Sequence, residues 1–211
     1  MVKLFVEGGG DSKAMKIECR RGFREFLEKA GFTGKMPGIS ACGSRRFAYD
    51  DYCTAVRNGE AAVLLVDSEA PVADFNQLGH SSGWRPWHHL KARQDDGWDK
   101  PQNVADTDCH LMVQVMESWF LADRGALKAF FGQGFRDKAL PAAHNAIESI
   151  TKQEVHAALK QATSHCKTRA AYDKGEHSFK LLAQIDPAKI TQASPWAKRF
   201  VDELRKKMKM A

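Results

Sequence analysis

Glu7 is followed directly by Gly8, Gly9 and Gly10 in the stretch VEGGGD, which ends the apolar run Val2–Val6. Glycines after a strand let the backbone approach a phosphate closely, and the N-terminus of a following helix attracts anions. A carboxylate repels a phosphate unless a cation lies between them. The stretch therefore predicts a metal-assisted phosphate site, with a plain strand-to-helix turn as the alternative.

The glycines complete no known nucleotide-binding fingerprint. A dinucleotide fingerprint would need a third glycine at Lys13, and the chain has no GxxxxGK phosphate loop. The glycines therefore indicate contact with a phosphate group but no particular nucleotide-binding motif. We expect Gly8, Gly9, Gly10 and Lys13 to lie against the substrate.

Two further carboxylates follow a second apolar run. Ala61–Val66 (AAVLLV) is typical of a strand in the middle of a parallel sheet, and Asp67 and Glu69 come after it. Ligands of open α/β sheets gather at the carboxyl ends of strands, where Glu7 also lies. Carboxylate oxygens suit Mg²⁺ or Mn²⁺, which bind and polarise substrate phosphates. Taken singly, Asp67 is a turn former and Glu69 a solvated charge; together with Glu7 they predict a metal centre.

The elements that would position these carboxylates alternate between strand and helix. The apolar spacing predicts a strand over Val2–Val6, a helix from Asp11 or Ser12 to Gly31, a strand over Ile39–Cys42, a helix over Arg46–Arg57 and a strand over Ala61–Val66. This order is typical of an α/β fold with a mostly parallel, Rossmann-like sheet flanked by helices.

The regular pattern stops between about residues 71 and 108, a length that favours a functional or mobile insertion or a small subdomain. This insertion contains GWRPWHHLKAR, in which Arg85, Trp87, His88 and Lys91 are candidate substrate contacts. Aromatic rings stack on nucleobases, and basic side chains follow a phosphate backbone. The alternative is that the tryptophans hold the insertion against the body of the protein.

The remainder of the chain indicates helices. HLMVQVMESWFLAD begins like a strand and turns helical near Glu117, and Asp123 can cap a helix that starts at Arg124. Later helices are predicted from the capping box of Thr151 and Glu154 to about Ala162, over 177–185, and from Pro195 onward. We therefore expect a core over residues 1–123 and a helical C-terminal part over 124–211 packed on it.

Two sets of basic residues in the C-terminal part are candidates for phosphate contact. Lys174 and His177 could reach a substrate phosphate, with ordinary roles at a helix start as the alternative. The last helix carries six basic residues against two acidic ones: Lys198, Arg199, Arg205, Lys206, Lys207 and Lys209 against Asp202 and Glu203. A solvated face explains this helix, and contact with nucleic acid or an acidic partner is the alternative.

The composition sets broad limits. The 211 residues carry a net charge of +6, which allows an anionic partner without requiring one. The odd number of cysteines, five, and the lack of a CxxC pair argue against a disulfide framework, so we expect reduced thiols and a cytoplasmic protein. We expect no signal peptide, and no apolar run is long enough for a membrane span.

The acidic motifs carry a family resemblance. Glu7 with GGGD, and DSE after an apolar strand, resemble the Toprim fold of topoisomerases, primases and overcoming-lysogenization-defect-type nucleases. More closely, VEGGGDSK, RRGFREFLEKAG, VDSEAPV, PWHHLKAR, DGWDKP and HLMVQVMESWFLAD resemble domain-of-unknown-function 4276, over nearly the whole chain. That bacterial family is Toprim-like and often associated with defence against phage.

The resemblance implies roles for four residues. Glu7 matches the Toprim glutamate, a general acid or base, and Asp67 matches the first aspartate of DxD, a Mg²⁺ ligand. Glu69 stands where the second aspartate would be; this longer side chain is a departure that could shift the metal or leave one site. Glu117 resembles a further acidic position of nuclease-type sites. The catalytic and metal set is thus Glu7, Asp67, Glu69 and Glu117.

The function implied is a Mg²⁺- or Mn²⁺-dependent nuclease acting on DNA or RNA as a defence effector, with an ATPase encoded nearby as partner; a homo-oligomer is left open. A non-catalytic subunit that binds an ATPase or nucleic acid is the first alternative. A phosphohydrolase or phosphotransferase acting on small nucleotides is the second.

Overall fold

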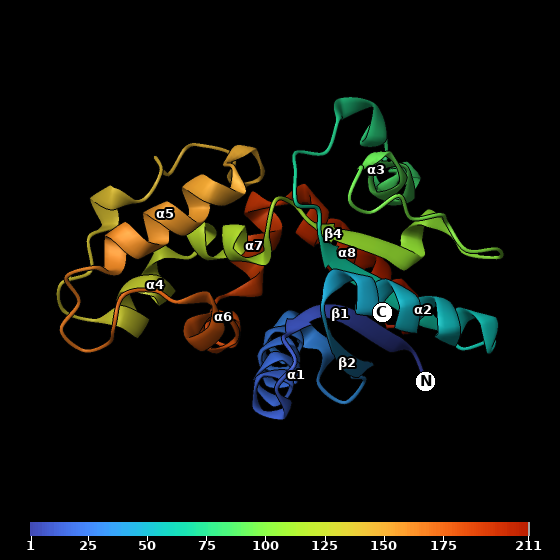
Figure 1. The fold of residues 1–211 in the computed structure, drawn as a ribbon, viewed down its shortest axis with the longest axis horizontal. Helices are drawn as coiled ribbons and strands as arrows, with labels where there is room; N and C mark the ends of the chain where they lie inside the picture. Colours follow the sequence, from blue (N-terminus) through green and yellow to red (C-terminus); the bar gives the residue numbers. More distant parts are fainter. Residues whose placement is uncertain (211) are drawn as a thin grey trace.

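The computed structural model describes residues 1–210 and contains one four-stranded sheet, which Figure 1 shows between its flanking helices. The strands are β1 (Lys3–Gly9), β2 (Gly38–Gly43), β3 (Ala62–Asp67) and β4 (Cys109–Met112). They pair in the order β2-β1-β3-β4, and every pair is parallel. The predicted α/β fold with a sheet flanked by helices is confirmed.

The register of the sheet decides where the acidic residues lie. Val6 of β1 is level with Leu65 of β3, so Glu7 lies one residue out of register with Asp67, and both acidic residues lie at the carboxyl edge of the sheet. All six residues of β3 are buried, as its continuous apolar run predicts for a strand covered on both faces.

Two helices cover opposite faces of the sheet because successive side chains of a strand point to opposite sides. Leu4 and Val6 share a core with Phe23 of α1 (Lys13–Leu27), whereas Phe5 packs in a second core with Tyr52 of α2 (Arg45–Arg57). Ser12 and Ser44 accept hydrogen bonds that cap α1 and α2, which confirms the predicted start of the first helix. A π-helical turn (Glu28–Phe32) extends α1.

The insertion after β3 is more regular than its sequence predicts. It contains the helix α3 (Pro86–Ala92) and three short 3-10 turns: Asp74–Asn76, Ser81–Gly83 and Asp106–Asp108. Proline at the first helical position starts α3. The helix is too short for its apolar spacing to stand out, so the sequence showed no regular pattern here.

The C-terminal part is helical, as predicted. After β4 come a 3-10 segment η5 (Met116–Ala122), α4 (Arg124–Phe131), 3-10 turns at Asp137–Ala139 and Ile147–Ser149, α5 (Lys152–Thr163), α6 (Lys174–Leu182), α7 (Pro187–Ala193) and α8 (Pro195–Lys207). The capping box at Thr151 and Glu154 and the cap at Asp123 are confirmed. The helix predicted over 177–185 instead begins at Lys174, because Asp173 caps it.

The C-terminal helices extend the core of the sheet. Helix α6 packs on α1, and α8 packs along β4 (Figure 1). Leu181 of α6 and Phe200 of α8 share one core with Val6 of β1. Within residues 1–210 no helix is both long and apolar enough to cross a membrane, and all five cysteines are free thiols.

Candidate metal centre

Three carboxylates meet at the carboxyl edge of the sheet. One oxygen each from Glu7, Asp67 and Glu69 lies within 4.8 Å of the other two. Glu7 comes from β1, Asp67 ends β3 and Glu69 follows two residues later, so the parallel sheet brings the first two to one edge and the turn after β3 adds the third. Three hard oxygen donors at this spacing fit a Mg²⁺ or Mn²⁺ ion.

Arg45 contacts both Glu7 and Asp67. It is the first residue of α2, directly after β2, and its guanidinium lies 3.4 Å from Glu7 Oε2. It also donates a hydrogen bond to the backbone carbonyl of Asp67 and a 2.6 Å bond to Asp96 of the insertion. Burial raises the pKa of Glu7, although the charge of Arg45 opposes this shift.

Asp67 is the most enclosed of the three carboxylates. Its Oδ1 accepts a 2.8 Å hydrogen bond from the backbone N–H of Met116, and its Oδ2 lies 4.0 Å from Lys174 Nζ. Burial, followed by the charges of Glu7 and Glu117, raises its pKa well above the usual range. This buried carboxylate therefore favours a bound proton or a nearby cation.

Glu69 has a strained backbone. Its φ is +61°, a left-handed conformation that is uncommon for residues other than glycine, and its N–H donates to the carbonyl of Gln114 at 2.9 Å. Gln114 is also left-handed, with φ +63°, and buried. Such strain gathers at functional sites, where surrounding contacts enforce it. Lys152 of α5 forms an ion pair with the Glu69 carboxylate.

Glu117 lies beside the three carboxylates in a polar enclosure of its own. Its Oε1 accepts hydrogen bonds from Ser178 Oγ (2.8 Å) and Tyr172 Oη (3.2 Å), and its Oε2 lies 3.8 Å from Lys174 Nζ and 3.5 Å from His156 Nε2. Burial alone would raise the pKa of Glu117, but the contact with His156, the charge of Lys174 and the bond from Ser178 together lower it to about 2. Glu117 thus keeps its charge and holds Lys174 close to Asp67.

The glycine loop forms the floor of a pocket of about 380 Å³ that also holds Glu7, Asp67, Glu117 and Lys174. Gly8 and Gly9 have φ of +129° and +88°. A Cβ would lie 2.6 Å from the ring of Phe179 at Gly8 and 2.8 Å from the Cα of Lys16 at Gly9. The loop is thus a tight turn that only glycine allows, and it also lines the acidic pocket.

Three further residues were predicted to contact the substrate: Lys13, Lys174 and His177. The structure places only one of them in the acidic pocket. Lys174 lies in the acidic pocket. Lys13 is exposed at the start of α1, outside the lining of that pocket. His177 is buried against Phe130 and Phe131, and its Nδ1 accepts a hydrogen bond from the N–H of Asp173.

The four candidates of the insertion also lie outside the lining of the acidic pocket. Trp87 is 3% exposed and packs against Tyr49 and Tyr52. Lys91 pairs with Asp99. His88 is exposed against Phe75, and Arg85 is exposed at the start of α3. Trp87 therefore holds the insertion on α2, which is the alternative weighed for the tryptophans.

Sequence reasoning missed the residues that surround the carboxylates: Arg45, Lys152, His156, Tyr172 and Ser178. Arg45 could have been found, since it follows a predicted strand at the same edge as Glu7. The other four come from the helical C-terminal part, far along the chain, and no local pattern marks them.

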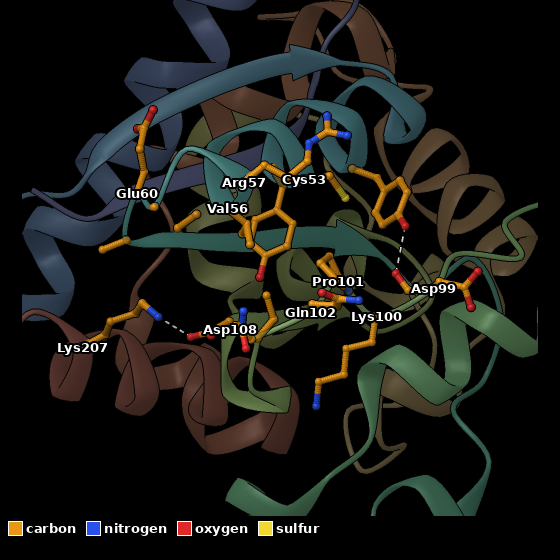
Figure 2. Close-up of a pocket in the computed structure, with 17 residues that line it drawn as sticks. Cys53, Val56, Arg57, Glu60, Asp99, Lys100, Pro101, Gln102, Asp108 and Lys207 are labelled. Carbon is orange, nitrogen blue, oxygen red and sulfur yellow. Dashed lines mark hydrogen bonds and ion pairs between the residues drawn. The ribbon is translucent and has the colours of Figure 1, made fainter.

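A larger cavity of about 800 Å³ lies elsewhere, between α2 and the segment before β4 (Figure 2). Most of its charged residues are already in ion pairs: Lys207 with Asp108 (Figure 2), Glu60 with Lys3, Asp99 with Lys91 and Lys100 with Asp106. None of the four candidate acidic residues lines it. The smaller acidic pocket is therefore the better candidate for chemistry.

Comparison with known proteins gives a family without an assigned activity. No curated protein and no solved structure matches the chain. A family model described as domain of unknown function (DUF4276) matches residues 6–205, which include the four acidic residues and all of α6. The expected resemblance to this family is confirmed, and the chain belongs to the DUF4276 family.

Proposed function

We propose that this protein is a nuclease that hydrolyses phosphodiester bonds of nucleic acid with the help of Mg²⁺ or Mn²⁺. The observation that carries the proposal is the meeting of Glu7, Asp67 and Glu69 within 4.8 Å at the carboxyl edge of a parallel sheet. Like charges enclosed together destabilise a fold unless a cation or protons intervene. Arg45, Lys152 and Lys174 offset part of this repulsion, and a bound metal ion would offset the rest.

The donor set fits such an ion. Glu7, Asp67 and Glu69 would hold it, and Glu117 would stand behind Lys174 as a buried counter-charge. When bound, the ion supplies polarisation of a phosphoryl oxygen and a lower pKa for a bound water.

The protein's own residues supply binding and proton transfer. Lys174 is 53% exposed at the mouth of the carboxylate cluster, where its ammonium can neutralise a phosphate oxygen. Arg45 offers a second positive charge beside Glu7. Burial raises the pKa of Glu7, which suits it to exchange a proton as a general acid or base; this role is the alternative to holding the ion.

Two further parts of the proposal rest on the resemblance alone: a role in bacterial defence against phage, and an ATPase partner encoded nearby. A third part is a Toprim relationship. The positions of Glu7 near the end of β1 and of Asp67-x-Glu69 at the end of β3 support it, because that family places its acids at the ends of the same strands.

One observation favours a second candidate, hydrolysis of a phosphate ester on a small nucleotide. The pocket of about 380 Å³ is within the range of small-molecule sites, and the carboxylates line it. A purely binding subunit has less support, because many basic residues of the insertion and of α8 pair with acids: Lys91 with Asp99, Arg93 with Asp96, Lys198 with Asp202, Lys206 with Glu203 and Lys207 with Asp108.

The test is cleavage of end-labelled single-stranded DNA, duplex DNA and RNA, with Mn²⁺, with Mg²⁺ and with chelator. Wild type is compared with Asp67→Asn and with Asp95→Asn, a control at an aspartate that is 89% exposed in the insertion. The proposal expects metal-dependent cleavage that Asp67→Asn abolishes and Asp95→Asn retains. Cleavage that survives in Asp67→Asn contradicts it. Turnover of free nucleotides with all polymers intact favours the second candidate.

A further inference from the structure

The acidic pocket has a second wall that is apolar. Met15, Met112, Met116 and Phe179 line it together with Glu7, Asp67 and Glu117. Met112 and Met116 are only 1% and 4% exposed, so the ends of β4 and η5 fix them. Met15 and Phe179 are partly exposed and come from α1 and α6, on either side of the glycine loop.

The glycines keep this wall within reach of a ligand. The methyl group of Met15 lies 3.6 Å from where a Cβ of Gly10 would be and 3.8 Å from that of Gly175. Side chains at these two positions would fill the space beside Met15. Gly10 of the glycine loop and Gly175 of α6 therefore leave room for a ligand beside Met15.

A phosphate and its metal make polar contacts only. The apolar residues would therefore contact a different, apolar part of the ligand. Three thioethers and one phenyl ring are a suitable surround for an aromatic ring, since sulfur atoms contact ring edges favourably and phenyl groups stack or meet edge to face. A nucleotide carries such a ring a short distance from its phosphate.

We propose that the wall of Met15, Met112, Met116 and Phe179 receives the nucleobase of the nucleotide whose phosphate lies at the carboxylates. The inference rests on the proposed function and narrows its substrate to a nucleotide with an unpaired base, at a strand end or in a single strand. A paired base inside a duplex would have to leave its stack to enter the pocket.

The test measures binding of two small probes by calorimetry in the presence of Mn²⁺: deoxyadenosine 5′-monophosphate and 2-deoxyribose 5-phosphate, which lacks the base. Wild type is expected to bind the nucleotide about tenfold more tightly, the usual size of a base-stacking contribution. This comparison needs no variant.

Two variants then assign the difference to the wall. Met15→Gln keeps the length of the side chain but adds a polar amide, and it is expected to bring nucleotide affinity down to that of the sugar phosphate. Ile17→Gln is the matched control on the same helix, at a residue that is 47% exposed and outside the pocket. It is expected to leave both affinities unchanged.

The outcomes separate the inference from the proposed function. Equal affinity for the two probes, with Mn²⁺ binding intact, overturns the nucleobase pocket and leaves the metal centre standing. Equal losses in Met15→Gln and Ile17→Gln also overturn it. If wild type binds no Mn²⁺, with or without a probe, the proposed function and the inference both fail.

Discussion

The backbone N–H of Asp67 donates a 3.1 Å hydrogen bond to Glu7 Oε2, so the ends of β3 and β1 are joined at the point where their acidic side chains emerge. The pairing of β1 with β3 holds both residues, and this hydrogen bond joins them directly. Sites built on strands keep their geometry better than sites on loops. The sheet itself therefore fixes the positions of Glu7 and Asp67.

Asp67→Asn is expected to make the metal-free protein more stable and to remove its response to metal. The amide can still accept from the N–H of Met116, but it ends the repulsion between Asp67, Glu7 and Glu117. Wild type should gain about 2.7 kcal/mol of unfolding free energy at a hundredfold excess of Mn²⁺ over its Kd. Thermal unfolding of both proteins, with and without millimolar Mn²⁺, measures each effect.

The control for this experiment is Asp95→Asn, which should match wild type with and without metal. A variant Asp67→Asn that is less stable than wild type without Mn²⁺, or that gains as much from it, would show that the carboxylates are ordinary turn residues. The same pair of measurements on Glu7→Gln should give changes of the same sign, because burial raises the pKa of Glu7 as well.

The stability advantage of Asp67→Asn is expected to shrink as the pH falls. The pKa of Asp67 is raised in the folded protein, so the folded state takes up a proton more readily than the unfolded state. Protonation therefore stabilises wild type as the pH falls from neutral toward the ordinary value of 3.8. Urea unfolding of both proteins at several pH values measures the difference.

The loss of stability caused by Glu117→Gln, in contrast, should not change with pH near neutrality. The pKa of Glu117 is lowered to about 2, so its contribution to stability is full above the ordinary value of 4.5 and is lost only below it. The penalty of this substitution should stay constant between about pH 7 and about pH 5. A constant difference for Asp67→Asn, or a changing one for Glu117→Gln over that range, contradicts the assigned shifts.

Local signals predicted much of the fold because they act over a few residues. Three local patterns each predicted one element correctly. The apolar run before Asp67 predicted a strand, and the cap at Ser12 and the capping box at Thr151 predicted helix starts. The convergence of Glu7 and Asp67 also follows from sequence, since all carboxyl ends of a parallel sheet lie at one edge.

The surroundings of the carboxylates could not be predicted in the same way. Tyr172, Ser178 and His156 reach Glu117 through the packing of α5 and α6, and no spacing in the chain encodes that packing. Trp87 illustrates the other limit. An aromatic residue among basic ones suggests a nucleic-acid contact, but burial against Tyr49 and Tyr52 gives the same pattern.

Gly22→Ala is expected to loosen the helix that carries Lys174. Gly22 lies in α1, where a Cβ would be 2.6 Å from the backbone carbonyl oxygen of Phe179 in α6. Alanine normally favours a helix interior over glycine by about 0.5–1 kcal/mol, so a purely local effect would stabilise. We expect instead a loss of about 1–3 kcal/mol, as in overpacked cores, together with weaker binding of deoxyadenosine 5′-monophosphate, whose phosphate Lys174 would contact.

Gly125→Ala in α4 is the matched control. Its Cβ would meet nothing closer than 3.5 Å, so this variant should be as stable as wild type or more so, with unchanged nucleotide binding. Chemical denaturation measures the stability of both variants, and calorimetry measures their nucleotide affinity. Equal stability of the two variants would mean that α6 moves freely on α1, and the position of Lys174 would then not depend on this contact.

Arg199→Lys is expected to destabilise the whole protein although it keeps the charge. The guanidinium is 1% exposed and donates to the carbonyls of Ser81, Asp106 and Cys109 at 2.7–2.9 Å, and its Nη1 lies 2.9 Å from Nδ1 of His110. It therefore links α8, the insertion and β4. A lysine has one ammonium and cannot replace a planar fork with five donors. Leaving buried carbonyls without donors should cost about 2–4 kcal/mol.

Arg205→Lys is the control on the same helix, because Arg205 is 41% exposed and donates one hydrogen bond, to the carbonyl of Ala30. Arg205→Lys should lower the free energy of unfolding by no more than about 1 kcal/mol. Urea denaturation gives both free energies, and hydrogen exchange shows where protection is lost. If Arg199 is the link described here, the loss extends over the insertion and β4, because both are bonded to it. Loss confined to α8 would mean that the insertion is held by Trp87 and its neighbours alone.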